Sequence, residues 1–278
     1  MKTLIELLQL LLSIFIKPKE PQVTQVPQVP VVESVTASEP VQEPIVDKPI
    51  PKPTIYTGWL KSAIRKDFPA SQYMQEKTNK FQIYTHHTVG GSAQSSINTW
   101  LQDPQRVCTH LIIERDGTAY QLFSLDYWGY HLYVASPGNK VDIEFKKNAS
   151  RYDMHSIGIE LCNFGPITVR NNRYYNLYNQ SIDPDDVIKL DFRGYQYWEK
   201  YDPRQIEGLR KVLLELLEIY PQIDYTPLIN TGGFELNRNA LKQKSGLYSH
   251  GNVRSDKSDS APQPILIEML NTLNLKNG

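Results

Sequence analysis

The sequence predicts an α/β fold in which helices flank a central mixed β-sheet. Short apolar, β-branched runs alternate with stretches of helical periodicity, which is typical of a sheet covered by helices. One pair of runs surrounds Asp116-Gly117, and this dipeptide is a strong signal for an antiparallel hairpin. The 278 residues are 40% hydrophobic and 22% charged, as in an ordinary globular protein. A hairpin among alternating strands and helices favours a mixed sheet.

The first 54 residues are predicted to form an apolar segment and a spacer. Residues 3–16 are strongly apolar, but these 14 residues are fewer than the ~20 that a transmembrane helix needs. They fit a signal sequence, an interfacial helix on a membrane, or a helix that packs on its own domain or on a second copy. Residues 18–54 hold nine of the 19 prolines and no glycine, which indicates an extended spacer. We expect three parts, 1–17, 18–54 and 55–278, and a location in the cell envelope by export or membrane tethering.

The elements of the folded part follow in order along the chain. GWLKSAIR (58–65) is a short amphipathic segment, and residues 165–201 form a polar, tyrosine-rich excursion with little periodicity. We expect strands at 81–88, 109–123 (the hairpin), 156–164 and 246–250, and helices at 92–103, at 202–220 and from Pro264 onward. The helix over 202–220 has the clearest signals. Asp202 can cap it, Pro203 suits its first turn, and its apolar residues share one face: Ile206, Leu209, Leu213 and Leu216.

Charge and cysteine content exclude some classes of function. The formal net charge is zero, from 30 basic and 30 acidic residues, so no basic field indicates a nucleic-acid partner. Cys108 and Cys162 form no CxxC pair, which excludes a cysteine zinc ribbon, and two ordinary buried thiols are favoured over a disulfide. The HExxH sequence of the common metalloprotease helix is absent.

Most of the six histidines lie at or near the ends of strand-like runs, where loops expose side chains. His86 ends such a run, and a neutral imidazole there is a suitable zinc ligand, although a lone histidine is more often structural. His87 points to the opposite side if the strand continues, so at most one of the pair binds a metal by the same route.

The sequence HGNVRSDKSD combines His250 with a carboxylate nine residues later, Asp259, and with Lys257 between them. A loop can fold back so that His250 and Asp259 meet one ion, with Asp256 as the rival carboxylate. Two histidines and one carboxylate leave an open fourth position, which is the layout of a catalytic zinc. Glu160 lies within the apolar run SIGIELCN, where it either pairs with a cation or acts as a general base beside the metal.

Four motifs in order, YTHHT, THLIIERDG, SIGIELCN and HGNVRSDKSD, resemble the type 2 N-acetylmuramoyl-L-alanine amidases. These enzymes share a fold with peptidoglycan-recognition proteins. The resemblance covers about residues 58–274. Within this family the sequence is most similar to phage and prophage cell-wall amidases. Three segments carry this similarity: GWLKSAIR, RGYQYWEKYDPRQIE and DKSDSAPQP.

The resemblance implies a zinc ion held by His86, His250 and Asp259. It implies that Glu160 is the general base and that Lys257 stabilises the oxyanion. Its further candidates, on the substrate side, are His87, His110, His131 and Asn163. The implied reaction is hydrolysis of the amide between N-acetylmuramic acid and L-alanine of peptidoglycan, in lysis or remodelling of a cell wall, by an endolysin of a phage or by a bacterial enzyme. The alternatives are a non-catalytic muropeptide-recognition module, a zinc peptidase of the stem peptide, and a tethering protein.

Overall fold

The computed structural model describes residues 56–228 and 231–273. The predicted apolar segment and the proline-rich spacer lie outside the described residues, so the boundaries at 17 and 54 stay predictions. No helix within the described part is long and apolar enough to cross a membrane.

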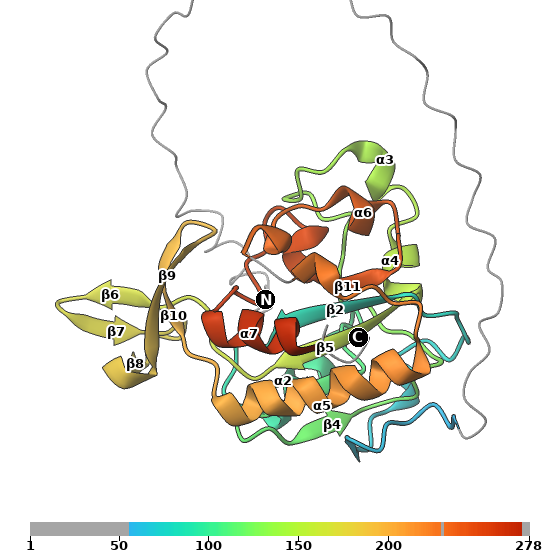
Figure 1. Cartoon of the computed structure of the whole chain (residues 1–278), viewed down its shortest axis with the longest axis horizontal. Coiled ribbons are helices and arrows are strands. Elements are labelled where there is room, and N and C mark those ends of the chain that lie inside the picture. The colour runs from blue at the N-terminus through green and yellow to red at the C-terminus, as the bar shows by residue number, and fades with distance from the viewer. Residues whose placement is uncertain (1–55, 229–230, 274–278) are drawn as a thin grey trace, which may run out of the picture. The chain divides into compact units, whose positions relative to one another are not determined.

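A six-stranded sheet forms the centre of the fold, with the strand order β1-β4-β3-β5-β2-β11 (Figure 1). β11, β2, β5 and β3 are parallel neighbours, whereas β3 and β4 form an antiparallel hairpin and β1 joins the edge parallel to β4. The predicted mixed sheet is therefore confirmed. The strands are β1 (Ile64–Arg65), β2 (Gln82–His87), β3 (Leu111–Ile113), β4 (Ala119–Gln121), β5 (Ser156–Leu161) and β11 (Gly246–Ser249).

The turn of the hairpin requires glycine at position 117. Gly117 has φ +88°, and a Cβ atom there would lie 2.3 Å from the carbonyl oxygen of Arg204. The turn therefore packs directly on the first turn of helix α5, which a larger residue would push away.

Helices α5 (Pro203–Ile219) and α7 (Pro264–Leu273) cover one face of the sheet (Figure 1). The Asp202 side chain accepts a hydrogen bond from the Arg204 backbone N–H, and Pro203 occupies the first turn, as predicted. The four apolar residues of the predicted face are buried against sheet residues such as Ile83 and Ile159. Full burial of an aliphatic side chain stabilises the folded state by about 1.5–3 kcal/mol. Because several such residues are buried here, this face holds the main core.

Shorter helices lie on the opposite face. They are α2 (Ala93–Leu101), α3 (Ile143–Lys146), α4 (Ser150–Met154) and α6 (Arg238–Leu241). Ser92 caps α2 through Ser95 N–H, and the Glu114 carboxylate accepts from Ala93 N–H. Cys108 and Cys162 are both buried free thiols, as the sequence favoured. This face is less uniformly apolar than the first, and it carries the polar cluster described below.

Residues 165–201, the polar excursion with little periodicity, contain strands that the sequence did not predict. This segment forms a three-stranded and a two-stranded sheet beside the main sheet (Figure 1). Asn171 and Asn172 both have positive φ, as the tight turn between β6 and β7 requires. The strands are β6 (Thr168–Arg170), β7 (Arg173–Tyr175), β8 (Ser181–Ile182), β9 (Val187–Phe192) and β10 (Tyr195–Glu199). Single 3₁₀ turns complete the described elements: η1 (Ala70–Gln72), η2 (Pro184–Asp186), η3 (Thr226–Leu228), η4 (Thr231–Phe234) and η5 (His250–Asn252).

Candidate functional site

Three neighbouring parallel strands bring the polar cluster together at their carboxyl ends. His86 lies near the end of β2, and His250 follows directly after β11. Glu160 on β5 is the register partner of His86, so the two side chains leave the same face of the sheet. The carboxyl ends of parallel strands are where ligand sites form in α/β sheets.

His86, His250 and Asp259 form the one group among the described residues whose ligand atoms could hold a metal ion. His86 Nδ1 lies 3.0 Å from His250 Nδ1 and 3.2 Å from Asp259 Oδ2, and His250 Nδ1 lies 2.7 Å from Asp259 Oδ2. A tetrahedral zinc ion with ligands at 2.0–2.1 Å separates them by about 3.3 Å. The three atoms are thus spaced much as metal ligands are. The structure brings together the three predicted ligands, and sheet alternation selects His86 over His87.

Hydrogen bonding fixes which nitrogen of His250 faces the cluster. His250 Nε2 lies 2.9 Å from the carbonyl oxygen of Leu132, which can only accept, so Nε2 carries the proton. Nδ1 then presents a lone pair to the Asp259 carboxylate and to His86. Lone pairs this close repel one another unless a cation or a proton lies between them. The donor set therefore fits a divalent metal such as zinc.

The protonation states also suit metal binding. Burial lowers the pKa of His86 to about 4, with a further contribution from His250. Burial likewise lowers the pKa of His250. Burial alone would raise the pKa of Asp259, but His250, His86 and Lys257 outweigh it and hold this pKa well below its usual value. Near neutral pH the site therefore holds two neutral imidazoles and one carboxylate, the forms that ligate metals.

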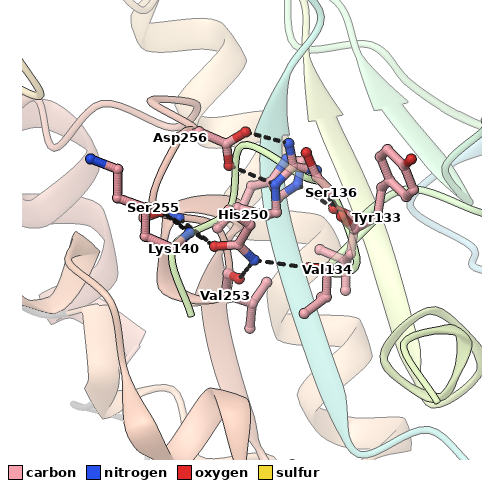
Figure 2. A network of polar contacts seen from close by, with 12 residues as sticks. Tyr133, Val134, Ser136, Lys140, His250, Val253, Ser255 and Asp256 are labelled. Carbon is pink, nitrogen blue, oxygen red and sulfur yellow. Dashed lines mark hydrogen bonds and ion pairs between the residues drawn. The ribbon is translucent and has the colours of Figure 1, made fainter. Parts of the chain in front are cut away.

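A second polar network holds the loop that carries His250 and Asp259 (Figure 2). Arg254 binds the carboxylate of Asp256 with two hydrogen bonds of 2.7 and 2.8 Å, and Asp256 is not in the group that could hold a metal ion. Arg254 Nη1 also donates to the carbonyl oxygens of Leu132 and Tyr133. His250 and Arg254 thus share the Leu132 carbonyl, which ties the loop from His250 to Asp259 to the segment after β4.

Asn139 extends this network, which the sequence did not indicate. Its side-chain N–H groups donate to the carbonyl oxygens of Val134 and Val253, at 3.0 and 2.8 Å. Its amide oxygen accepts from Ser255 N–H. One buried amide therefore joins the segment at Val134 to the loop that carries His250 and Asp259.

Glu160 carries an unsatisfied oxygen beside the cluster. Among the described residues, its Oε2 has no hydrogen-bond partner although that atom is buried. Burial raises the pKa of Glu160 well above its usual value, Asp259 raises it further, and Lys257 opposes them. A buried carboxylate oxygen without a partner is costly in a purely structural role. The positive charge of Lys257 lowers the pKa of both Glu160 and Asp259.

The four predicted substrate-side residues lie in the interior. His87 points to the opposite face and contacts Trp198. The His110 ring is hydrogen-bonded to the Tyr127 carbonyl oxygen and to the Gly158 backbone N–H. Asn163 donates to the carbonyl oxygens at positions 199 and 200 and accepts from Gly165 N–H. His131 lies behind His86, with both ring nitrogens hydrogen-bonded. Their contact with substrate stays a prediction.

The stability of the metal-free protein is expected to fall as the pH falls from about 6.5 to 4. Burial lowers the pKa of His87 from 6.5 to about 4, so the unfolded chain binds more protons than the folded chain in this window. One such histidine lowers the free energy of unfolding by about 2 kcal/mol when the pH falls from 7 to 5. Urea denaturation with chelator present measures the free energy of unfolding at pH 7 and at pH 5. The variant His87→Gln should reduce the difference between the two values by about that amount. An unchanged difference would contradict the lowered pKa of His87.

Comparison with known proteins places the sequence in a family. The family model described as N-acetylmuramoyl-L-alanine amidase matches residues 79–262, more than half of the chain. No curated protein matches the sequence.

Solved structures are similar at low identity. An endolysin N-acetylmuramoyl-L-alanine amidase from Clostridium intestinale, LysCS, is 17% identical, with a TM-score of 0.41, 76% of this chain covered and 95% of that chain. A selenomethionine derivative of AmpD is 18% identical, with a TM-score of 0.40 and coverages of 77% and 96%. PlyL is 13% identical, with a TM-score of 0.40 and coverages of 76% and 96%. By the match over residues 79–262, the chain belongs to the N-acetylmuramoyl-L-alanine amidase family.

Proposed function

We propose that this protein is a zinc-dependent amidase that hydrolyses the bond between N-acetylmuramic acid and L-alanine in peptidoglycan. One observation carries the proposal. The side-chain atoms of His86, His250 and Asp259 converge beside Glu160, whose Oε2 has no hydrogen-bond partner in the part of the chain that the structure describes. Family membership supports the choice of substrate.

The residues of the chain divide the chemistry among them. A bound zinc ion supplies Lewis-acid chemistry, activating water and polarising a carbonyl group. Glu160 takes a proton from the attacking water at Oε2 and delivers it to the amine of the departing L-alanine. Lys257 places a positive charge where the carbonyl oxygen becomes negative.

The acid–base role of Glu160 requires a carboxylate that can both lose and regain a proton. Burial alone makes the charged form costly and raises the pKa of this group. Positive charge from Lys257 and from a bound metal acts in the opposite direction. The two effects thus act on the pKa of Glu160 in opposite directions.

A non-catalytic recognition module would need the fold but not the base. The buried Glu160 carboxylate, and a lysine, Lys257, whose charge lowers the pKa of Glu160 and of Asp259, favour an enzyme over such a module. We also propose that residues 3–16 and the spacer at 18–54, outside the described residues, deliver the domain to the cell envelope.

Zinc content and peptidoglycan digestion test the proposal together. Purified protein is expected to contain about one zinc ion per chain and to release soluble stem peptides from purified sacculi. A chelator should stop the release, and added zinc should restore it. Full digestion by protein that contains no metal would refute the zinc-dependent mechanism.

A further inference from the structure

We propose that His131 and Ser156 are positioning residues that fix the tautomer of His86 and so present its Nδ1 to the metal. The inference rests on the proposed zinc site. It assigns His131 a place behind a ligand, with Ser156 as the residue that orients it. Both residues would act on the ion through His86.

The direction of the hydrogen bonds is set at Ser156. Its Oγ lies 2.6 Å from the carbonyl oxygen of Tyr152, and a carbonyl oxygen can only accept. The single hydroxyl proton of Ser156 is therefore donated to Tyr152. Ser156 Oγ must then accept from His131 Nε2, which lies 2.9 Å away.

The proton positions on His131 and His86 follow in the same way. A neutral imidazole carries one proton, so His131 with its proton on Nε2 has a lone pair on Nδ1. That Nδ1 lies 3.0 Å from His86 Nε2 and accepts the proton there. His86 Nδ1 is left with a lone pair directed toward His250 and Asp259.

The opposite arrangement conflicts with these distances. A proton on His86 Nδ1 would require His131 to donate from Nδ1 and Ser156 to donate to His131 Nε2. Ser156 Oγ and the Tyr152 carbonyl oxygen would then face each other at 2.6 Å with no proton between them. Two oxygen atoms at that separation repel without a shared proton.

A single dipeptide orients both metal-binding histidines. The His131 side chain holds His86, and the next residue, Leu132, accepts from His250 Nε2 through its carbonyl group. Asp153 Oδ1 accepts from both backbone N–H groups of this dipeptide, at 2.8 and 2.9 Å. A change in this dipeptide should therefore alter metal binding.

Space for the His131 ring depends on a glycine in β5. A Cβ atom on Gly158 would lie 3.0 Å from His131 Nδ1 and 2.8 Å from Thr109 Cγ2. The His131 ring is nearly perpendicular to that of His86, at an interplanar angle of 82°. The hydrogen bond between His131 Nδ1 and His86 Nε2 joins these two rings.

Metal-free wild-type protein gives the first test. In protein labelled with ¹⁵N-histidine, long-range ¹H–¹⁵N correlation should show the proton of His86 on Nε2 and that of His131 on Nε2. A proton on His86 Nδ1 would overturn the inference without any variant.

Zinc affinity gives the second test, by competition with a chromophoric chelator. His131→Phe and Ser156→Ala should weaken zinc binding by about 10–100-fold, the usual cost of losing a partner that orients a ligand. His131→Gln and Ser156→Thr keep an acceptor and a hydroxyl and should restore part of the loss. His155→Phe removes a histidine that is as buried as His131 and is hydrogen-bonded to the Asn79 carbonyl oxygen, outside this chain of hydrogen bonds, so this variant should bind zinc like the wild type.

The outcomes separate this inference from the proposed function. If the wild-type protein bound no zinc, the zinc site itself would fail. If the wild type bound zinc and folded His131→Phe and Ser156→Ala bound it equally well, the positioning role would be wrong. An equal loss in His155→Phe would also overturn it, because the effect would then be general to buried histidines.

Discussion

Glu160→Gln is expected to lower amide hydrolysis by about 10²–10⁴-fold, the usual contribution of a general base, while zinc content stays unchanged. Glutamine has the shape of glutamate but cannot accept and return a proton. The side chain lies on the metal-site face of β5 as the register partner of His86, and its Oε2 is unpartnered among the described residues. Release of stem peptides from sacculi measures the rate.

The control for Glu160→Gln is its zinc content and thermal stability. Removing an ionisable group from this buried position should leave the protein folded and at least as stable as the wild type, because burial disfavours the charged form. Glu160→Ala should behave in the same way in turnover. Wild-type rates in either variant would mean that another group takes the proton.

Asp259→Ala is expected to reduce zinc binding below detection and to abolish hydrolysis with it. Asp259 Oδ2 is the carboxylate oxygen of the ligand group, within 3.2 Å of His86 Nδ1 and 2.7 Å of His250 Nδ1. Without it, two neutral imidazoles remain, too few to hold zinc tightly. His86→Ala and His250→Ala should have the same effect. Metal analysis of the dialysed protein measures it.

Asp256→Ala is the matched control, three positions away on the same loop. Its carboxylate is bound by Arg254 and is not one of the ligand atoms. This variant should keep its zinc, although the loop loses an ion pair. Equal loss of zinc in both variants would indicate that the whole loop had collapsed.

The sequence predicted the long, regular elements of this fold. The strands around 81–88 and 156–164 and the helix over 202–220 have many apolar residues at one period, so local pattern and tertiary burial agree. The five strands within 168–199 were missed because they have two to six residues each and pair chiefly with one another. A turn signal was present at Asn171-Asn172, but the flanking residues alternate too weakly to mark a hairpin.

The site was predicted in unequal parts. Loop spacing indicated His250 and Asp259, and the choice of His86 over His87 came from family resemblance. The hydrogen bonds that orient the predicted ligands could not be predicted from the sequence. Ser156 meets His131 across 25 positions and His131 meets His86 across 45, contacts that only the packed sheet creates. A motif shows which residue types are present, but their hydrogen-bond directions depend on the fold.

Identification of the bond cut in purified sacculi tests the central claim most directly. Mass spectrometry of the soluble products should find stem peptides that begin with a free L-alanine amine. The glycan strands should keep N-acetylmuramic acid with a free lactyl carboxylate, and their release should stop when zinc is chelated. Cleavage within the stem peptide or between the sugars would contradict the assignment of this protein as an N-acetylmuramoyl-L-alanine amidase.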